Sequence, residues 1–219
     1  MPVYETRKLN VRIGSLQWRI RALKNRDQFS DPDGAAERAG ICSASWSLFG
    51  QLWPASQVLA KAAKRLDITD RRILELGCGL GLPSLVLQAR GANVTASDHH
   101  PLSEPFLDYN AELNQLSPIP YLDLPWSSRP QEVGGQFDVI IGSDILYERN
   151  HASMLAELIQ HLAAVKAKIL ITCPGRGHRN QFSRLLQKLG FELTATKTAF
   201  TEDEQPPYRG QLLCYRRGF

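Results

Sequence analysis

The stretch from Ile73 to Ser84 constrains the fold more than any other part of the chain, because an apolar run there leads into a glycine-rich turn. The apolar run is typical of a strand buried on both faces of a parallel sheet. Three alternating glycines follow it and permit a tight turn in which backbone N–H groups approach a ligand closely: Gly77, Gly79 and Gly81. Pro83 fits the first turn of a helix. The stretch therefore predicts a strand, a ligand-binding turn and a helix, in that order.

An acid and a missing glycine restrict the ligand that this turn can hold. Glu75 lies two residues before the first glycine. Phosphate is the usual ligand of such turns, whereas a carboxylate on the ligand side favours a ligand that carries a cation. The dinucleotide pattern Gly-x-Gly-x-x-Gly would also need a glycine at position 82, where the chain has Leu82. A nicotinamide-dependent oxidoreductase is therefore a weak alternative.

Length and composition indicate an ordinary globular protein. The chain has 219 residues, which suits one domain with a full hydrophobic core. It contains no apolar run that approaches the roughly 18 residues of a membrane span. The polar start, Met1 to Arg12, does not resemble a signal peptide, so we expect a cytoplasmic protein. The four cysteines lack Cys-x-x-Cys spacing, which argues against a zinc site and a secreted disulfide framework.

From residue 72 onward, strand and helix patterns alternate, which predicts an α/β fold with a doubly wound, mostly parallel sheet. We expect seven strands, near 72–76, 93–97, 119–122, 137–143, 167–173, 191–199 and 211–217. We expect helices between them, near 83–90, 103–116, 151–164 and 178–189. Only the polar loop 201–210 joins the last two strands, so they should pair antiparallel.

The N-terminal part of the chain has a different pattern. Residues 3–23 alternate in type around Gly14-Ser15, which predicts a β-hairpin, and residues 24–52 predict a covering segment with at least one short helix. We therefore divide the chain into residues 1–52 and residues 53–219, which together form one structural unit. We expect the second part to begin with a helix from Pro54 to Asp67. Basic residues are concentrated at the start and fit either a nucleic-acid contact or, more simply, a solvated strand face: Arg7, Lys8, Arg12, Arg19, Arg21, Lys24 and Arg26.

Polar side chains follow two strands at the carboxyl edge of the predicted sheet, beside the glycine turn. Asp98 ends the second strand, where a carboxylate can accept both hydroxyls of a ribose. His99 and His100 come next, and we expect them to flank a nucleoside. Adjacent histidines rarely bind one ion and no third ligand is evident, so we predict no metal site. Asp123 follows the third strand, and its carboxylate fits either an adenine amine or a turn or helix cap.

A strongly apolar strand at 137–143 delivers a second set of candidates to the same edge: Ser143, Asp144 and Tyr147. Asp144 also fits the N-cap of a helix, and capping can coexist with a role in an active site. Leu124 and Trp126 are candidate apolar walls for an adenine ring.

These motifs resemble those of a known family. The alternating glycines with an upstream acid resemble motif I of the class I S-adenosylmethionine-dependent methyltransferases, whose seven-strand sheet ends in a reversed pair. Asp144-x-x-Tyr147 resembles the Asp/Glu-x-x-Tyr/Phe signature of the seven-strand protein lysine methyltransferases, methyltransferase family 16. Trp53-Pro54-Ala55 resembles the tryptophan motif that lines the cofactor pocket of that family. The motifs span about residues 46–174.

The resemblance implies S-adenosylmethionine as the cofactor and a lysine of a protein as the methyl acceptor. It implies that Asp144 accepts a hydrogen bond from the target amine, while Tyr147 and Trp53 form the walls of a narrow channel that favours desolvation of the amine. The candidate cofactor-binding residues are Trp53, Glu75, Gly77, Cys78, Gly79, Gly81, Asp98, His99, Asp123, Leu124, Trp126 and Ser143.

Two other functions stay open. A small-molecule amine N-methyltransferase would share the sheet but would need a closed pocket. A cofactor-binding module would act on RNA through the basic hairpin, although the chain lacks the Asn/Asp-Pro-Pro-Tyr/Phe motif of the methyltransferases that act on bases or glutamine. Arg176 and His178 could contact an acidic substrate group, and the acidic loop from Glu202 to Tyr208 fits a lip for a basic substrate or a solubilising loop.

Overall fold

A seven-stranded sheet forms the centre of the molecule in the computed structural model, which describes residues 4–25, 31, 33–43, 48–127, 136–175, 177–197 and 208–219. Its strands are β3 (Arg72–Leu76), β4 (Asn93–Asp98), β5 (Tyr121–Asp123), β6 (Phe137–Ser143), β7 (Ala163–Cys173), β8 (Glu192–Lys197) and β9 (Gln211–Arg217). They lie side by side in the order β5-β4-β3-β6-β7-β9-β8.

The first five of these strands run parallel, and β9 pairs antiparallel with both β7 and β8. The predicted mostly parallel sheet with a reversed C-terminal pair is therefore confirmed. The strand order reverses beside β3, because β4 lies on one side of it and β6 on the other. In open parallel sheets, ligands bind outside the carboxyl ends of the strands at such a reversal.

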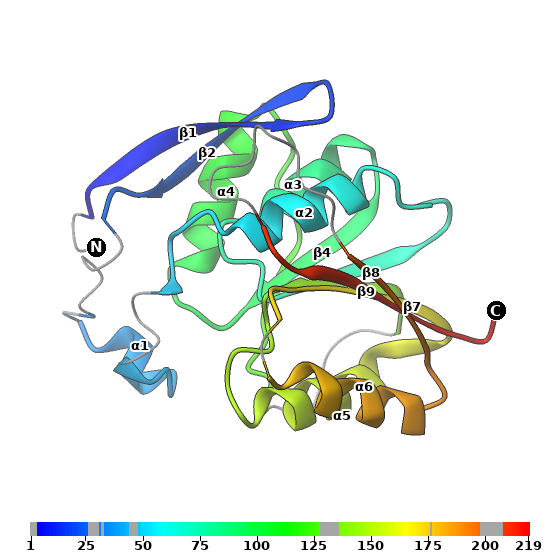
Figure 1. Ribbon diagram of the computed structural model, residues 1–219. Helices are drawn as coiled ribbons and strands as arrows, with labels where there is room; N and C mark the ends of the chain where they lie inside the picture. Colours follow the sequence, from blue (N-terminus) through cyan, green and yellow to red (C-terminus); the bar gives the residue numbers. More distant parts are fainter. Residues whose placement is uncertain are drawn as a thin grey trace.

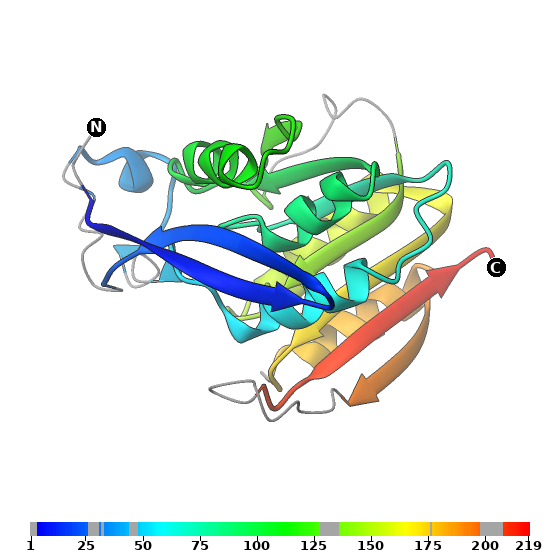
Figure 2. The same ribbon diagram turned by 90° about the horizontal axis from the view of Figure 1, so that it is seen from above.

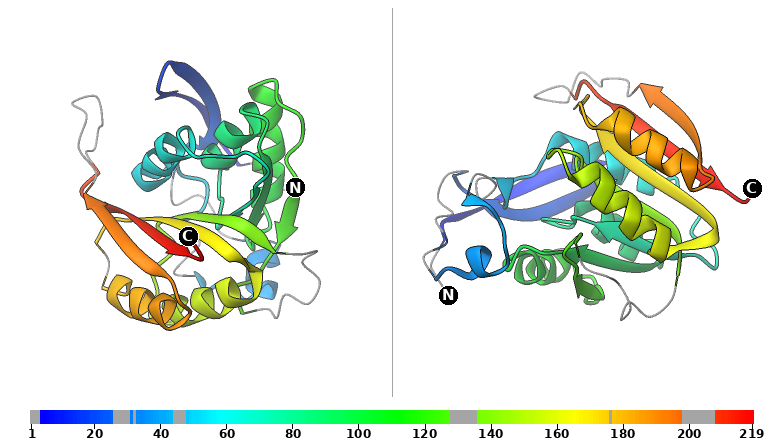
Figure 3. Two further views of the ribbon diagram at one scale, coloured as in Figure 1. Left: turned by 90° about the vertical axis from the view of Figure 1, so that its right-hand side faces the viewer. Right: turned by 90° about the horizontal axis from the view of Figure 1, so that it is seen from below.

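Helices cover both faces of the sheet (Figure 1). One face carries α2 (Pro54–Ala63), α3 (Leu82–Ala89) and α4 (Ser103–Leu113), and the other carries α5 (His151–Leu162) and α6 (Arg179–Lys188). The left view in Figure 3 shows the two layers on opposite sides of the sheet. Each layer has its own apolar cluster, one that joins Leu85 of α3 to Ile73 of the sheet and one that joins Leu155 of α5 to Ile140.

Two elements differ most from their predicted bounds. Helix α2 ends at Ala63 and does not reach Asp67, because the N–H groups of Arg65 and Leu66 bond to carbonyls three residues back and tighten the chain into a turn. Strand β7 begins at Ala163 directly after α5, four residues earlier than predicted, and its pairing with β6 shifts register between Phe137 and Val139.

The predicted N-terminal hairpin consists of β1 (Thr6–Ile13) and β2 (Leu16–Leu23), with Gly14 in the turn at φ 64°. Figure 2 shows the hairpin lying over the helical layer that contains α2, α3 and α4. The Asn110 side chain of α4 accepts a hydrogen bond from the backbone N–H of Arg21 at 2.7 Å and donates one to the carbonyl of Leu80 at 3.0 Å. The hairpin and the sheet domain thus share one core, and the division at residue 52 stays a prediction.

The segment after the hairpin returns toward the carboxyl edge of the sheet. It contains the short helix α1 (Ala35–Arg38), whose first N–H groups bond to the Asp31 carboxylate at 2.9 and 2.8 Å. The backbone N–H of Leu23 donates to the carbonyl of Gly50 at 2.8 Å, which anchors the other end of the segment to the hairpin. In the part of the chain that the structure describes, no helix has the length and apolar character needed to cross a membrane.

Candidate active site

A cavity of about 430 Å³ lies at the carboxyl ends of β3, β4 and β6, where the strand order reverses. Its floor is the glycine turn after β3, and the ends of β4 and β6 form two of its walls. Residues 39–42 and 48–51 of the covering segment form another wall. Ten of the predicted site residues line it: Trp53, Gly77, Cys78, Gly79, Asp98, His99, Trp126, Ser143, Asp144 and Tyr147.

The three glycines of the turn all adopt left-handed backbone angles, with φ of 63° at Gly77, 54° at Gly79 and 78° at Gly81. A Cβ at Gly77 would crowd Ile145, and one at Gly81 would overlap Leu107. A Cβ at Gly79 would meet no atom within 4 Å. The backbone at Gly79 is therefore open to the cavity, and a ligand can approach it there.

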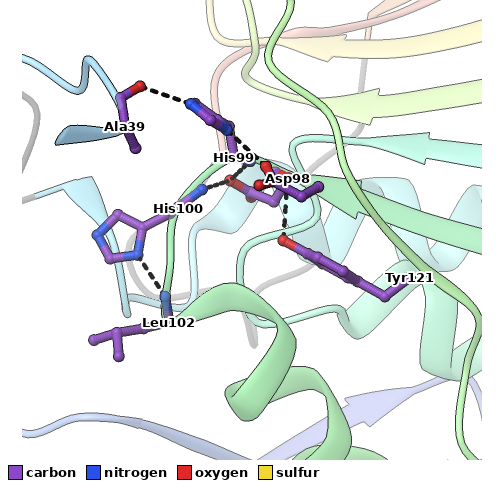
Figure 4. A network of polar contacts seen from close by, with 7 residues as sticks. Ala39, Asp98, His99, His100, Leu102 and Tyr121 are labelled. Atoms are coloured by element: carbon purple, nitrogen blue, oxygen red, sulfur yellow. Dashed lines mark hydrogen bonds and ion pairs between the residues drawn. The ribbon is translucent and has the colours of Figure 1, made fainter. Parts of the chain in front are cut away.

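Asp98, at the end of β4, bonds to the backbone of His99 and His100 (Figure 4) and to that of Gly79 in the glycine turn. Its Oδ2 accepts the backbone N–H of Gly79 at 2.8 Å, and its Oδ1 accepts those of His99 and His100 at 2.8 and 3.0 Å. Burial raises the pKa of Asp98, and these three hydrogen bonds oppose the shift. Asp98 also lines the cavity, where a carboxylate can accept a hydrogen bond from a ligand hydroxyl.

His99 connects Asp123 to the covering segment. Its Nδ1 lies 2.6 Å from Oδ1 of Asp123, and its Nε2 lies 2.6 Å from the carbonyl oxygen of Ala39. These two contacts tie the end of β4 to the strand beside it and to the covering segment. The Asp123 side chain is 72% exposed and is not part of the cavity wall. Its contact in the structure is therefore with His99, and the predicted contact with an adenine amine has no support.

His100 packs as a core residue. Its ring stacks on Phe49 at a centroid distance of 3.8 Å, and burial lowers its pKa to about 4. A neutral imidazole at this position joins the covering segment to the end of β4. Over the described residues, no three His, Cys, Asp or Glu side chains are grouped as metal ligands.

Glu75 lies behind the glycine turn and not on its ligand side. The side chain is fully buried, and its Oε2 accepts hydrogen bonds from the backbone N–H and the hydroxyl of Ser84, in the first turn of α3. Burial raises the pKa of Glu75 to about 8, although the two hydrogen bonds from Ser84 oppose this. The carboxyl group therefore holds the start of α3, and the expectation that it faces the ligand needs correction.

Two further predicted residues lie outside the cavity wall. Gly81 is the N-cap residue of α3 and lies against Leu107 of α4. Leu124 is 4% exposed and belongs to the apolar cluster on the α5 side of the sheet, while its N–H donates to the carbonyl of Asp98 at 3.0 Å. Both therefore support the site from behind.

Asp144 follows β6 in a backbone conformation that few side chains adopt, with φ of 54°. Aspartate is one of the residues that tolerate this left-handed region. Its N–H donates to the carbonyl of Thr172 in β7 at 2.9 Å, which fixes the position of the backbone. The N-cap of the next helix, α5, is Asn150. The helix-cap alternative for Asp144 is therefore excluded, and the residue lines the cavity together with Tyr147.

Two tryptophans form apolar parts of the cavity wall. Trp53 precedes α2, and its indole N–H donates to the carbonyl of Leu48 at 3.1 Å, which links it to the covering segment. Trp126 also lines the cavity, with its ring centroid 6.5 Å from that of Tyr147.

A further wall, which the sequence patterns did not predict, is made by the start of α5 and the residues before it: Glu148, Asn150, His151 and Met154. His151 lies four residues after Tyr147, and Met154 lies three residues after His151. This helical spacing is a sequence signal for the wall. His178 is the N-cap residue of α6 and is not part of the cavity wall. Arg176 and residues 202–207 of the acidic loop lie outside the described residues.

The sheet, the glycine turn and the cavity at the reversal of strand order define the class I S-adenosylmethionine-dependent methyltransferase fold. The solved structure of the 16S rRNA N2 G1207 methyltransferase RsmC from T. thermophilus, in complex with AdoMet and guanosine, has the same fold. The two superpose with a TM-score of 0.67 at 18% identity, over 99% of this chain and 52% of that chain.

Residues 43–189 match the family of lysine methyltransferases, and the chain belongs to this family. A protein N-lysine methyltransferase, METTL21A from zebrafish (Danio rerio), is 30% identical over 152 residues, which cover 64% of this chain and 68% of the relative. The human (Homo sapiens) electron transfer flavoprotein beta subunit lysine methyltransferase is 27% identical over 146 residues, or 64% of this chain and 54% of the relative. The chain is therefore an S-adenosylmethionine-dependent methyltransferase.

The residues present fit this cofactor. The cavity has the volume typical of a small-molecule site. The open backbone at Gly79 gives close access to a ligand, and the Asp98 carboxylate lines the same cavity.

Proposed function

We propose that the chain transfers a methyl group from S-adenosylmethionine to the side-chain amine of a lysine in another protein. One observation carries the proposal: Asp144 and Tyr147, at the end of β6, line the same cavity as the glycine turn after β3. An acceptor amine held by Asp144 and a cofactor held by the turn would thus share one space. The family membership and its lysine-specific relatives support the choice of acceptor.

For the cofactor, Asp98 would accept a ribose hydroxyl and the backbone at Gly77 to Gly79 would lie against the ligand. Bound S-adenosylmethionine supplies an electrophilic methyl group on a sulfonium, which is a good leaving group. Trp126, Ser143 and Trp53 would exclude water from the surface between cofactor and acceptor. Much of the rate in such a transfer comes from alignment of the reacting groups, so rigid walls matter more than covalent chemistry.

For the acceptor, Asp144 would accept a hydrogen bond from the lysine amine and fix its direction. The carboxylate also attracts the protonated amine, so it orients the substrate better than it deprotonates it. Tyr147 and Trp53 would form the walls of the channel and favour the neutral amine by desolvation.

The hairpin gives little support to an RNA-directed function. The Arg21 guanidinium lies 4.6 Å from the Tyr109 ring centroid, and Arg19 donates to the carbonyl of Leu113 at 2.6 Å. These two basic side chains pack the hairpin onto α4, and their contacts explain them without a nucleic-acid ligand. A small free amine is also disfavoured, because the cavity wall includes the exposed residues Cys42 and Asn150 and so reaches the surface.

Incubation of the protein with S-adenosylmethionine labelled in the methyl group and a cell extract tests the proposal. We expect label in protein, on the side-chain nitrogen of a lysine identified by mass spectrometry of the labelled peptide. Label found only in RNA, only in the small-molecule fraction or only on another amino acid would overturn it.

A further inference from the structure

We propose that His151 accepts the proton that the substrate amine must lose, with Glu148 passing it to solvent; this inference rests on the lysine methyltransferase function proposed above. A lysine arrives as an ammonium, whose nitrogen has no lone pair for attack. Each methyl transfer therefore releases one proton. Asp144 stabilises the charged ammonium more than the neutral amine, so the site needs a separate acceptor for that proton.

His151 is positioned at the acceptor wall. It is the first residue of α5, four residues after Tyr147, and it lines the cavity together with Asp144. Its ring centroid lies 4.4 Å from that of Tyr147 and 4.8 Å from that of Trp126, with interplanar angles of 84° and 86°. Two perpendicular aromatic contacts hold the imidazole in one orientation.

A hydrogen bond on one ring nitrogen sets the tautomer. Nδ1 of His151 lies 3.2 Å from the carbonyl oxygen of Ile145. A carbonyl can only accept, so Nδ1 carries the hydrogen in the neutral ring and Nε2 keeps its lone pair. Burial lowers the pKa of His151, and the nearby His178 acts in the same direction, while Glu148 and the Ile145 carbonyl oppose the shift. The ring is therefore neutral near pH 7, with its basic nitrogen at Nε2.

The surroundings of Nε2 suit a transient imidazolium. Oε2 of Glu148 lies 3.5 Å from Nε2 and can stabilise the positive charge. The Glu148 side chain is 43% exposed, so it also contacts water. The Tyr147 and Trp126 rings both lie within the roughly 6 Å at which an aromatic ring attracts a cation.

The proton transfer balances without a further reactant. One N–H proton of the ammonium moves to Nε2 of His151, and the electron pair of that bond stays on the lysine nitrogen. The imidazolium then gives the same proton through Glu148 to water, which restores the neutral ring. Among the described residues, Tyr147 and Glu148 contact His151, His178 acts on its charge, and Asp144 lines the same cavity.

The rings of Trp126, Tyr147 and His151 do not form a cage that could bind a methylated ammonium. Such a cage needs open space between its rings, whereas Trp126, Tyr147 and His151 pack against one another. The arrangement supports a proton acceptor with ordered walls.

The test compares His151→Phe, which keeps an aromatic ring but has no basic nitrogen, with His161→Phe at an exposed position of the same helix. Turnover of the labelled lysine substrate is measured from pH 7 to pH 10. General acid–base groups contribute about 10²- to 10⁴-fold, so we expect at least a 100-fold loss at pH 7 for His151→Phe. The loss should shrink about tenfold per pH unit, because a larger share of the lysine arrives neutral. His161→Phe should match the wild type.

Two readouts separate this role from a structural one. The affinity for S-adenosylhomocysteine, measured by calorimetry, should be unchanged in His151→Phe. Two-bond ¹H–¹⁵N correlation NMR of the wild type without cofactor should show His151 with its proton on Nδ1. A proton on Nε2, no loss of turnover, or a loss that is equal at pH 7 and pH 10 would overturn the role of His151. A wild type that labels no lysine would instead overturn the proposed function, and this inference with it.

Discussion

Ser84 donates two hydrogen bonds to the Glu75 carboxyl group, one from its backbone N–H at 3.0 Å and one from its hydroxyl at 2.5 Å. Glu75 lies in β3 and Ser84 in the first turn of α3, so the pair closes the glycine turn from behind. The turn is held by this buried contact on one side and by Asp98 on the other. The cavity floor is therefore fixed before any ligand arrives.

The buried Glu75 should make stability depend on pH. Its pKa is raised from the ordinary value of 4.5 to about 8 by burial, against the two hydrogen bonds from Ser84. Between these two values the unfolded chain has lost the proton and the folded protein still holds it. The free energy of unfolding should therefore fall by a few kcal/mol as the pH rises from 4.5 to 8.

Urea denaturation of the protein without cofactor, across this pH range, measures the effect. In Glu75→Gln the side chain keeps its size and an acceptor for Ser84 but cannot ionise. The variant should have a flatter dependence than the wild type. Equal slopes for the two proteins would show that Glu75 does not titrate in this way.

The glycine at 81 should be needed for packing as well as for backbone conformation. Gly81 and Gly91 both have left-handed backbone angles, with φ of 78° and 74°, but only at Gly81 would a Cβ overlap a neighbour, Leu107. Gly91→Ala should cost about 1–2 kcal/mol from the backbone alone. Gly81→Ala should cost about 2–5 kcal/mol, because overpacking adds to the backbone term. Denaturation midpoints test this, and equal losses would exclude the contribution of Leu107.

The carboxylate of Asp98 should contribute directly to cofactor affinity. Asp98→Asn removes the charge and replaces one of two oxygens, both of which accept backbone N–H groups, with a donor. We expect the Kd for S-adenosylhomocysteine to rise about 10- to 100-fold, the loss typical of a hydrogen bond to a charged group. Calorimetry measures the change, and Asp108→Asn on the exposed face of α4 is the matched control. If both variants bound equally, Asp98 would not contact the ligand.

Sequence patterns were sufficient for the parts of the fold that depend on neighbours along the chain. Apolar runs and glycine spacing predicted the strands, the turn after β3 and the antiparallel C-terminal pair. They also brought Asp98 and Asp144 to one edge, because the carboxyl ends of parallel strands meet there.

The direction of individual side chains could not be predicted in the same way. Glu75 lies in a strand buried on both faces, so alternation did not reveal that it points toward Ser84. Asp123 turns to His99, a contact across 24 residues that depends on strand pairing. His151 was missed because its role arises from packing between the start of α5 and Trp126, which no local motif encodes.

The central claim is that Asp144 orients the acceptor amine in the cavity that holds the cofactor. Asparagine tolerates the left-handed backbone at this position, so Asp144→Asn removes the charge while preserving the fold. The decisive measurement is methyl transfer to the identified lysine substrate by this variant, at saturating S-adenosylmethionine. We predict a loss of turnover of about 100-fold with unchanged affinity for S-adenosylhomocysteine. Full turnover by Asp144→Asn with the cofactor bound would contradict the account.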